Sequence, residues 1–129
     1  MARFLVLLIA VPALLICGLA GCGGAKTYTD AAQPISAKVG GEFVIAQESN
    51  PSTGYSWQPT YEMSQLQLVE RTFQQKEGTS GMVGAGGTES FRFRALKDGN
   101  AQLTLVYKRA WEQQSEGQIT KVFTVVIAQ

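Results

Sequence analysis

The sequence from position 34 onward predicts an all-β fold, an immunoglobulin-like antiparallel β-sandwich of about seven strands. Short runs rich in Val, Ile, Phe, Tyr and Thr alternate between apolar and polar residues with a period of two, which is typical of strands with one buried face. Gly, Asn, Asp and Ser separate these runs, and no segment has the apolar stripe of a helix. Many short strands without intervening helices are typical of a sandwich.

The amino end predicts an export signal. One positive charge at Arg3 precedes an uncharged apolar run from Phe4 to Leu19, which is short for a membrane span and favours export with removal. The run ends in Leu19-Ala20-Gly21-Cys22, which resembles the bacterial lipobox, where cleavage before the cysteine leaves it as the lipid-modified first residue. We therefore expect a lipoprotein signal peptide at 1–21 and export to the cell envelope with a lipid anchor at Cys22, on the outer membrane facing the periplasm if the cell has two membranes. Plain secretion is the alternative.

The stretch after the expected cleavage site, 22–33, predicts a lipidated cysteine followed by a flexible tether. It is small and polar, has no periodicity and contains no apolar cluster. A single domain then covers 34–129. The processed chain of roughly 108 residues is long enough to bury one core without a disulfide.

The composition excludes several classes of function. The chain has no histidine, and its two cysteines, Cys17 and Cys22, lie in the signal region, which excludes Ser-His-Asp, Cys-His and imidazole or thiolate zinc sites. Loss of Arg3 with the signal leaves ten basic and ten acidic residues, so the net charge is zero and offers nucleic acid no basic surface. The acidic residues are scattered singly, which makes a two-carboxylate enzyme the least favoured alternative. We expect no enzyme, no metal, no cofactor and no small-molecule substrate.

Seven segments fit the strand pattern. The alternation is clearest late in the chain, where Phe91, Phe93 and Ala95 share one face and their polar neighbours share the other. Trp57 falls on the third segment, where immunoglobulin-like sandwiches bury an aromatic residue, so we expect it in the core. The predicted strands are 34–39, 42–48, 55–61, 66–74, 88–96, 101–109 and 119–128.

The connections between these strands divide into two sets. If consecutive strands run antiparallel, the connections after the second, fourth and sixth strands emerge at one end of the sandwich. These are 50–54, a glycine-rich stretch at 75–87, and 110–118, whereas the opposite set is short and plain. Length and chemistry gathered at one end are typical of a binding surface on a rigid scaffold. The first strand starts at that same end, so we expect the tether to hold these loops clear of the membrane.

The first of these connections predicts a rigid loop. In Asn50-Pro51-Ser52-Thr53-Gly54-Tyr55, the proline fixes its own φ, the glycine can take a positive φ, and the polar side chains can bond local backbone groups. A loop constrained in this way loses little entropy when a partner docks on it. An ordinary sandwich turn is the alternative.

The other two connections carry different chemistry. Gly84-Ala85-Gly86-Gly87 lets the backbone approach a partner closely, although a flexible linker is equally consistent, and the lack of a GKS or GKT sequence disfavours a phosphate site. Arg109-Ala110-Trp111 places a tryptophan just past a strand among polar residues, and exposed Trp and Arg most often dominate interfaces. The alternative is a Trp111 that folds back over the sandwich edge, with Arg109 paired to Glu112.

Taken together, these three segments resemble the signature motifs of a known family. Asn50 to Tyr55, Gly84 to Gly87 and Arg109 to Trp111 follow the order of the motifs in the chagasin-like inhibitors of papain-family cysteine peptidases. The resemblance covers essentially the whole of 34–129. The third motif departs from the family pattern, because Ala110 stands where the family has proline, and proline would stiffen that loop.

The resemblance implies a reversible, non-covalent, tight-binding inhibitor of papain-like cysteine peptidases, in which three loops occlude the active-site cleft. Thr53 would lie nearest the catalytic cysteine of the enzyme, with the glycine-rich backbone and Trp111 on either side. The competing hypothesis is a lipid-anchored immunoglobulin-like adhesion or assembly module that binds another envelope protein or a glycan. The peptidase-binding residues implied by the family are Asn50, Pro51, Ser52, Thr53, Gly54, Tyr55, Gly84, Ala85, Gly86, Gly87, Arg109 and Trp111.

Overall fold

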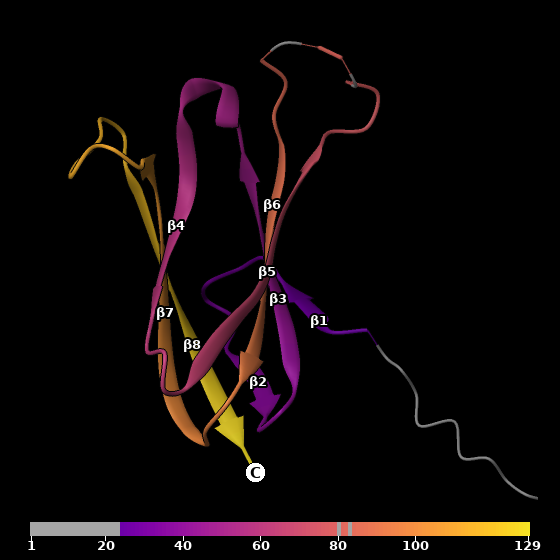
Figure 1. Cartoon of the computed structure of the whole chain (residues 1–129), viewed down its shortest axis with the longest axis vertical. Coiled ribbons are helices and arrows are strands. Elements are labelled where there is room, and N and C mark those ends of the chain that lie inside the picture. Colours follow the sequence, from indigo (N-terminus) through magenta and orange to yellow (C-terminus); the bar gives the residue numbers. More distant parts are fainter. Residues whose placement is uncertain (1–23, 80, 83) are drawn as a thin grey trace, which may run out of the picture.

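The structure, a computed structural model, describes residues 24–79, 81–82 and 84–129. This part of the chain folds into two β-sheets packed face to face, with one short 3-10 helix, η1 (Pro51–Thr53), between two of the strands (Figure 1). The strands are β1 (Lys26–Tyr28), β2 (Ile35–Lys38), β3 (Glu42–Ser49), β4 (Tyr55–Tyr61), β5 (Leu66–Gln75), β6 (Gly87–Ala95), β7 (Gly99–Arg109) and β8 (Ile119–Ala128).

The sheet topology confirms the β-sandwich and corrects its strand count and pairing. One sheet has the order β1-β3-β6-β5 and the other the order β2-β8-β7-β4, so the described residues form eight strands instead of about seven. β1 pairs parallel with β3, and β2 pairs parallel with β8, which makes both sheets mixed. The expectation of purely antiparallel sheets is wrong at these two edges because β1 and β2 belong to different sheets, and each lies beside a strand that runs in its own direction.

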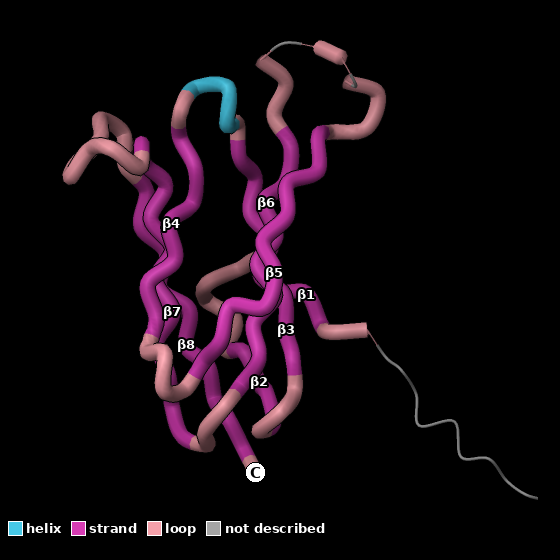
Figure 2. The backbone as a smooth tube through the Cα atoms, viewed as in Figure 1, coloured by secondary structure: helices cyan, strands magenta, loops and turns pink. Residues whose placement is uncertain are grey.

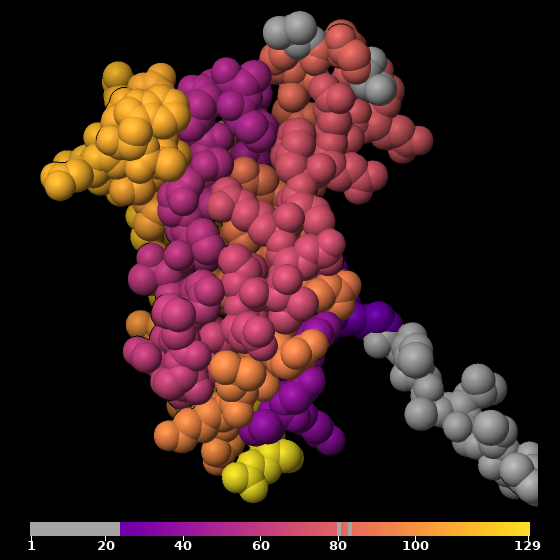
Figure 3. All heavy atoms as spheres, in the orientation of Figure 1, coloured from indigo at the N-terminus to yellow at the C-terminus, as the bar shows by residue number. Residues whose placement is uncertain are grey.

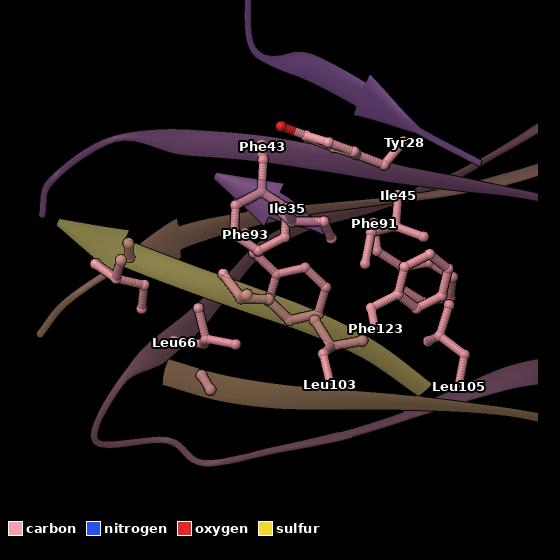
Figure 4. Packing of buried hydrophobic residues seen from close by; sticks show 14 of the residues in the cluster. Tyr28, Ile35, Phe43, Ile45, Leu66, Phe91, Phe93, Leu103, Leu105 and Phe123 are labelled. Atoms are coloured by element: carbon pink, nitrogen blue, oxygen red, sulfur yellow. The ribbon is translucent and has the colours of Figure 1, made fainter. Parts of the chain in front are cut away.

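The core lies between the sheets where the alternation of the sequence predicts it. Phe91 and Phe93 of β6 point inward, and Leu103 and Leu105 of β7 approach them from the other sheet (Figure 4). Burying each of these side chains contributes about 1.5–3 kcal/mol to folding. Trp57 is also buried, as expected for a core aromatic. Every residue of this cluster lies between Tyr28 and Ile127, so the core of the part that the structure describes lies within residues 24–129.

A buried carboxylate closes one flank of the sandwich. Trp57 lies on β4, an edge strand of its sheet, and its backbone N–H donates to Glu89 Oε2 at 2.9 Å. Arg71 Nη2 donates to the carbonyl of Trp57 at 2.9 Å and lies 3.6 Å from the same carboxylate. Glu89 and Arg71 belong to the facing sheet and satisfy edge groups that a further strand would otherwise bind. This arrangement prevents β4 from pairing with another chain at this point.

The segment expected to be a flexible tether is part of the domain from Lys26 onward. Lys26 pairs with Phe43, and Tyr28 is 2% exposed within the core, while its hydroxyl accepts the N–H of Ser36 at 3.3 Å. Three residues are too few to show a period of two, so the pattern could not reveal β1. The predicted signal peptide, Cys22 and the first tether residue lie outside the described residues. In the part of the chain that the structure describes, no helix is long and apolar enough to cross a membrane.

The three long connections emerge at one end of the sandwich, as the parity of the strands predicts (Figure 2). The amino end of the domain does not lie beside them. Lys26 pairs with Phe43, near the start of β3, whereas Ser49 at the end of the same strand adjoins the loops. Six residues of strand separate the two positions, or about 20 Å. The expectation that the chain enters beside the loops is therefore wrong, because it took β2 to be the first strand and took that strand to begin at the loops, whereas β2 pairs only with Val125–Ala128 at the far end of β8.

Candidate functional site

Three loops form a continuous surface at one end of the domain. We call the connection between β3 and β4 the first loop (50–54), that between β5 and β6 the second loop (76–86) and that between β7 and β8 the third loop (110–118). Figure 3 shows them as neighbouring projections with the first loop, in purple, between the other two. The strand register sets this arrangement, because Ser49 and Gln75 both pair with Gly87, and Tyr55 pairs with Arg109.

The first loop is a hydrogen-bonded turn. Thr53 N–H donates to Asn50 O at 3.2 Å and Gly54 N–H donates to Pro51 O at 2.9 Å, which closes the single turn of η1. The side chains add local bonds, since Ser52 Oγ donates to Asn50 Oδ1 at 2.6 Å and Thr53 Oγ1 donates to Asn50 O at 2.7 Å. Pro51, Ser52 and Thr53 are exposed. The uncharged first loop is thus closed by local hydrogen bonds of the kind from which the sequence predicts a rigid loop.

Gly54 joins the first loop to the third. Its φ is +83°, a left-handed conformation that glycine adopts without steric cost. A Cβ built at this position would lie 2.7 Å from Cη2 of Trp111, so the indole ring of the third loop lies directly over the glycine. Arg109 Nε also donates to the carbonyl of Thr53 at 3.5 Å. Gly54, which the turn requires for its positive φ, is thus also the residue against which the Trp111 ring packs.

The second loop approaches the first through its backbone. Asn50 Nδ2 donates to Gly84 O at 3.1 Å, and a Cβ at Gly86 would come within 3.3 Å of Ser49 O. Gly84 is exposed, whereas Ala85 and Gly86 are partly buried. Gly87 is the first residue of β6, and a Cβ there would overlap the carbonyl of Gln74. Glycine at 86 and 87 therefore permits close backbone contact, here with the ends of β3 and β5 of the chain itself.

The third loop presents Trp111 to solvent. Trp111 is 73% exposed, so the alternative of a tryptophan folded back over the sandwich edge is wrong. The ion pair of that alternative does form, with Arg109 Nη1 at 3.3 Å from Glu112 Oε1. The guanidinium also lies over the ring of Tyr55, 4.8 Å from its centroid. Arg109 is therefore engaged within the domain, and Trp111 is the large apolar group that the loop exposes to solvent.

An aromatic stack beneath the loops ties them to the sandwich. The ring of Tyr107 lies between those of Tyr55 and Trp57. Its centroid is 5.5 Å from that of Tyr55 and 5.0 Å from that of Trp57. Tyr107 Oη accepts the N–H of Asn50 at 2.9 Å, Tyr55 Oη donates to Glu116 O at 2.6 Å, and Trp57 Nε1 donates to Glu48 O at 2.9 Å. Sequence reasoning missed the role of Tyr107. Its signal was its place as an inward aromatic residue near the end of an alternating strand, shortly before the third loop.

The electrostatics of the surface are local. The first loop carries no charge, and Glu112 of the third loop is held ionised, because hydrogen bonding from Ser115, followed by that from Arg109, lowers the pKa of its carboxyl group. No three metal-ligating side chains lie together in the described ranges.

A groove of about 690 Å³ opens between the first and second loops. Ser49 lies at its base with a buried hydroxyl that has no hydrogen-bond partner among the described residues. The groove is lined by Glu48, Ser49, Asn50, Gln74, Gln75, Lys76, Glu77, Gly86, Gly87, Thr88 and Tyr107.

Comparison with known proteins gives consistent matches. The family described as "Chagasin family peptidase inhibitor I42" matches residues 36–127. Amoebiasin-2 of Entamoeba histolytica is 34% identical over 83 residues, which span 64% of this chain and 68% of that protein. The solved cysteine protease inhibitor EhICP2 of the same organism superposes with a TM-score of 0.66 at 27% identity, over 80% of this chain and 95% of its own. PbICP-C, solved in complex with falcipain-2, shares the fold alone, with a TM-score of 0.55 at 17% identity over 81% and 89% of the two chains.

Proposed function

This chain belongs to the chagasin family of peptidase inhibitors and is not an enzyme, and we propose that it inhibits papain-like cysteine peptidases by reversible, non-covalent, tight binding. The observation that carries the proposal is the packing of three loops into one surface, in which Asn50 bonds Gly84 and Trp111 lies over Gly54. A surface assembled before the partner arrives loses little conformational entropy on binding.

The first loop is the part that enters the active-site cleft in this proposal. Its exposed Pro51, Ser52 and Thr53 form a helical turn, in which no carbonyl is held as in an extended substrate. A nucleophilic cysteine therefore meets hydroxyl and amide groups at Thr53 without a peptide bond in attack geometry. Three hydrogen bonds anchored on Asn50 and Pro51 keep the turn in this shape. The loop binds in the cleft and is not cleaved.

The second and third loops flank the first and close the cleft on either side. The backbone from Gly84 to Gly87 offers close approach on one side, and Trp111 offers a large exposed aromatic group on the other. Exposed tryptophans are among the residues whose truncation costs most at interfaces. Three loops of this size can form an interface of about 1,600 Å², which is enough for nanomolar binding when it is well packed.

Titration of papain with a soluble form, residues 24–129, tests the proposal. We expect stoichiometric loss of peptidase activity, and we expect Thr53→Arg and Trp111→Ala each to raise the inhibition constant at least about tenfold with folding unchanged. Met63→Ala is the matched control, because Met63 is 76% exposed but lies in the connection after β4, at the end opposite the loops. Absence of inhibition would favour an adhesion module, and full inhibition by both loop variants would reject the assignment of the loops.

We also propose that the protein is exported and anchored by lipid at Cys22. The support is the lipobox-like sequence, and β1 places the point where the chain joins the domain about 20 Å from the loops. Because residues from Lys26 onward are held in the sandwich, a long tether is not required to keep the loops accessible. Bacteria expressing the full chain with labelled palmitate should yield a labelled membrane protein, and Cys22→Ser should abolish the label. An unlabelled, secreted wild type would show plain secretion.

A further inference from the structure

A single serine is buried in a loop that is otherwise mostly exposed. Ser115 is 5% exposed, although its neighbours Gln114 and Glu116 face solvent. Its hydroxyl donates to Glu112 Oε2 at 2.7 Å and accepts the N–H of Arg109 at 3.0 Å. The Ser115 hydroxyl therefore links the backbone of Arg109, at the end of β7, to the carboxylate of Glu112 in the third loop.

Glu112 completes this arrangement from the other side of Trp111. Its second oxygen, Oε1, lies 3.3 Å from Arg109 Nη1, and its N–H donates to the carbonyl of Arg109 at 3.1 Å. Trp111 thus lies in a short segment, from Arg109 to Glu112, whose two ends are bonded to each other and to Ser115. We call these three residues, Arg109, Glu112 and Ser115, the clasp.

Further bonds hold the remainder of the loop. Lys108 Nζ donates to the carbonyls of Glu112 and Gln113 at 3.1 and 3.3 Å, and the N–H of Ser115 donates to Gln118 Oε1 at 3.3 Å. The indole itself is mostly in solvent, with its far edge over Gly54. Core packing therefore does not fix Trp111. Its position depends on the backbone that carries it.

We propose that Glu112 and Ser115 are positioning residues for peptidase binding, which hold the third loop so that Trp111 is fixed over the first loop before the enzyme arrives. This inference rests on the proposed function for its binding consequence, while the position of Trp111 in the free protein can be tested separately. Without the clasp, the segment from Arg109 to Glu112 samples several conformations, and binding has to restrict it to one.

A double-mutant cycle tests whether the clasp acts through Trp111. In residues 24–129, Ser115→Ala and Glu112→Gln are each expected to raise the inhibition constant for papain about five- to tenfold. In a Trp111→Ala background, the same changes should raise it less than about twofold, because the group they position is gone. Asp98→Asn, at an exposed carboxylate between β6 and β7 at the end opposite the loops, is the control and should leave inhibition unchanged. Equal losses in both backgrounds, or none in the wild type, would overturn the proposal.

Fluorine NMR of 5-fluorotryptophan-labelled protein tests the clasp without an enzyme. The soluble form has two tryptophans, Trp57 and Trp111, and loss of one resonance in Trp111→Ala assigns both. Ser115→Ala should move the Trp111 resonance toward the position of free tryptophan and leave that of buried Trp57 in place. If wild-type protein fails to inhibit papain, the proposed function is wrong. The Trp111 resonance then still tests, without an enzyme, whether the clasp holds Trp111 in place. An unmoved Trp111 resonance would overturn it.

A pH titration of the same spectrum separates the carboxylate from a purely structural effect. The charged groups that face Glu112 are Arg109 and Lys108 of β7, and the element packed behind them contributes the neutral ring of Tyr55. Hydrogen bonding from Ser115 lowers the pKa of Glu112, so the clasp persists in mild acid and opens as the pH falls through that lowered pKa. The Trp111 resonance should shift over that range in wild-type protein and not in Glu112→Gln. The same shift in both would overturn the role of Glu112.

Discussion

Gly54→Ala is expected to damage inhibition more than stability. Two effects act at this position. An alanine at a φ of +83° has to occupy the left-handed region, which costs about 1–2 kcal/mol of the free energy of unfolding. In addition, its Cβ would lie 2.7 Å from Cη2 of Trp111, well inside contact distance. Because the atom it meets is the far edge of an exposed side chain, the indole moves aside and the backbone does not.

The size of each effect follows from this geometry. The backbone cost should lower the midpoint of thermal unfolding by about 4–8 °C per kcal/mol in a domain of this length. Displacement of Trp111 from its seat should raise the inhibition constant for papain at least about tenfold, or roughly 1.4 kcal/mol of binding free energy. In Trp111→Ala protein there is no indole to displace, and this additional loss should disappear.

Gly40→Ala provides a control with the same backbone conformation. Gly40 also has a φ of +83°, but nothing lies within 4 Å of a Cβ built there, and it follows β2 at the end away from the loops. We expect both alanine variants to lose similar stability in denaturant unfolding and only Gly54→Ala to lose inhibition. Equal inhibition by the two variants would refute the reasoning that Gly54 seats Trp111.

Three further predictions concern the support of the loops and of the sandwich. Tyr107→Phe removes the hydroxyl that accepts the N–H of Asn50, so we expect a loss of about 1 kcal/mol in unfolding free energy together with a several-fold weaker inhibition; unchanged values for both would contradict the anchoring role. Ser49→Ala removes a buried hydroxyl without a partner among the described residues, so chemical denaturation should show a more stable protein by about 1 kcal/mol, and a less stable one would show that the hydroxyl is satisfied, for example by water. The pKa of Glu42 is lowered chiefly by its hydrogen bond with Arg94, so its contribution to stability is complete above the ordinary glutamate value of 4.5 and is lost as the pH falls through the lowered pKa. Unfolding midpoints measured from pH 6 downward should therefore fall less steeply in Glu42→Gln than in wild type, and parallel curves would refute this.

The sequence predicted the strands because a period of two is a local property. Phe91, Phe93 and Ala95 had to share a face whatever lay opposite them, and the structure buries all three. The same reasoning failed for β1, where the only strong signal in three residues is Tyr28, and it therefore also misplaced the amino end. Parity arguments depend on counting every strand, so a missed first strand moves the start of the domain but leaves the later loops where they were expected.

The sequence predicted which loops gather at one end of the sandwich but not the contacts that support them. Turn chemistry in Asn50 to Gly54 selects a positive φ and local side-chain bonds, which can be recognised in a single stretch of sequence. The bond from Asn50 to Tyr107 joins residues 57 positions apart, and that from Tyr55 to Glu116 joins residues 61 positions apart. No local pattern indicates such pairs. Ser115 is likewise an ordinary loop serine until its burial and its partners are known.

By itself, the sequence determined the sandwich, the inward faces of its strands, the turn of the first loop and the end at which three loops gather. These features depend on φ preferences and on alternation over a few residues, which act within one segment. The tertiary structure decided which loop lies against which, where the amino end enters and how Trp111 is held. Those features depend on hydrogen bonds and contacts between distant segments, which exist only after the two sheets have packed.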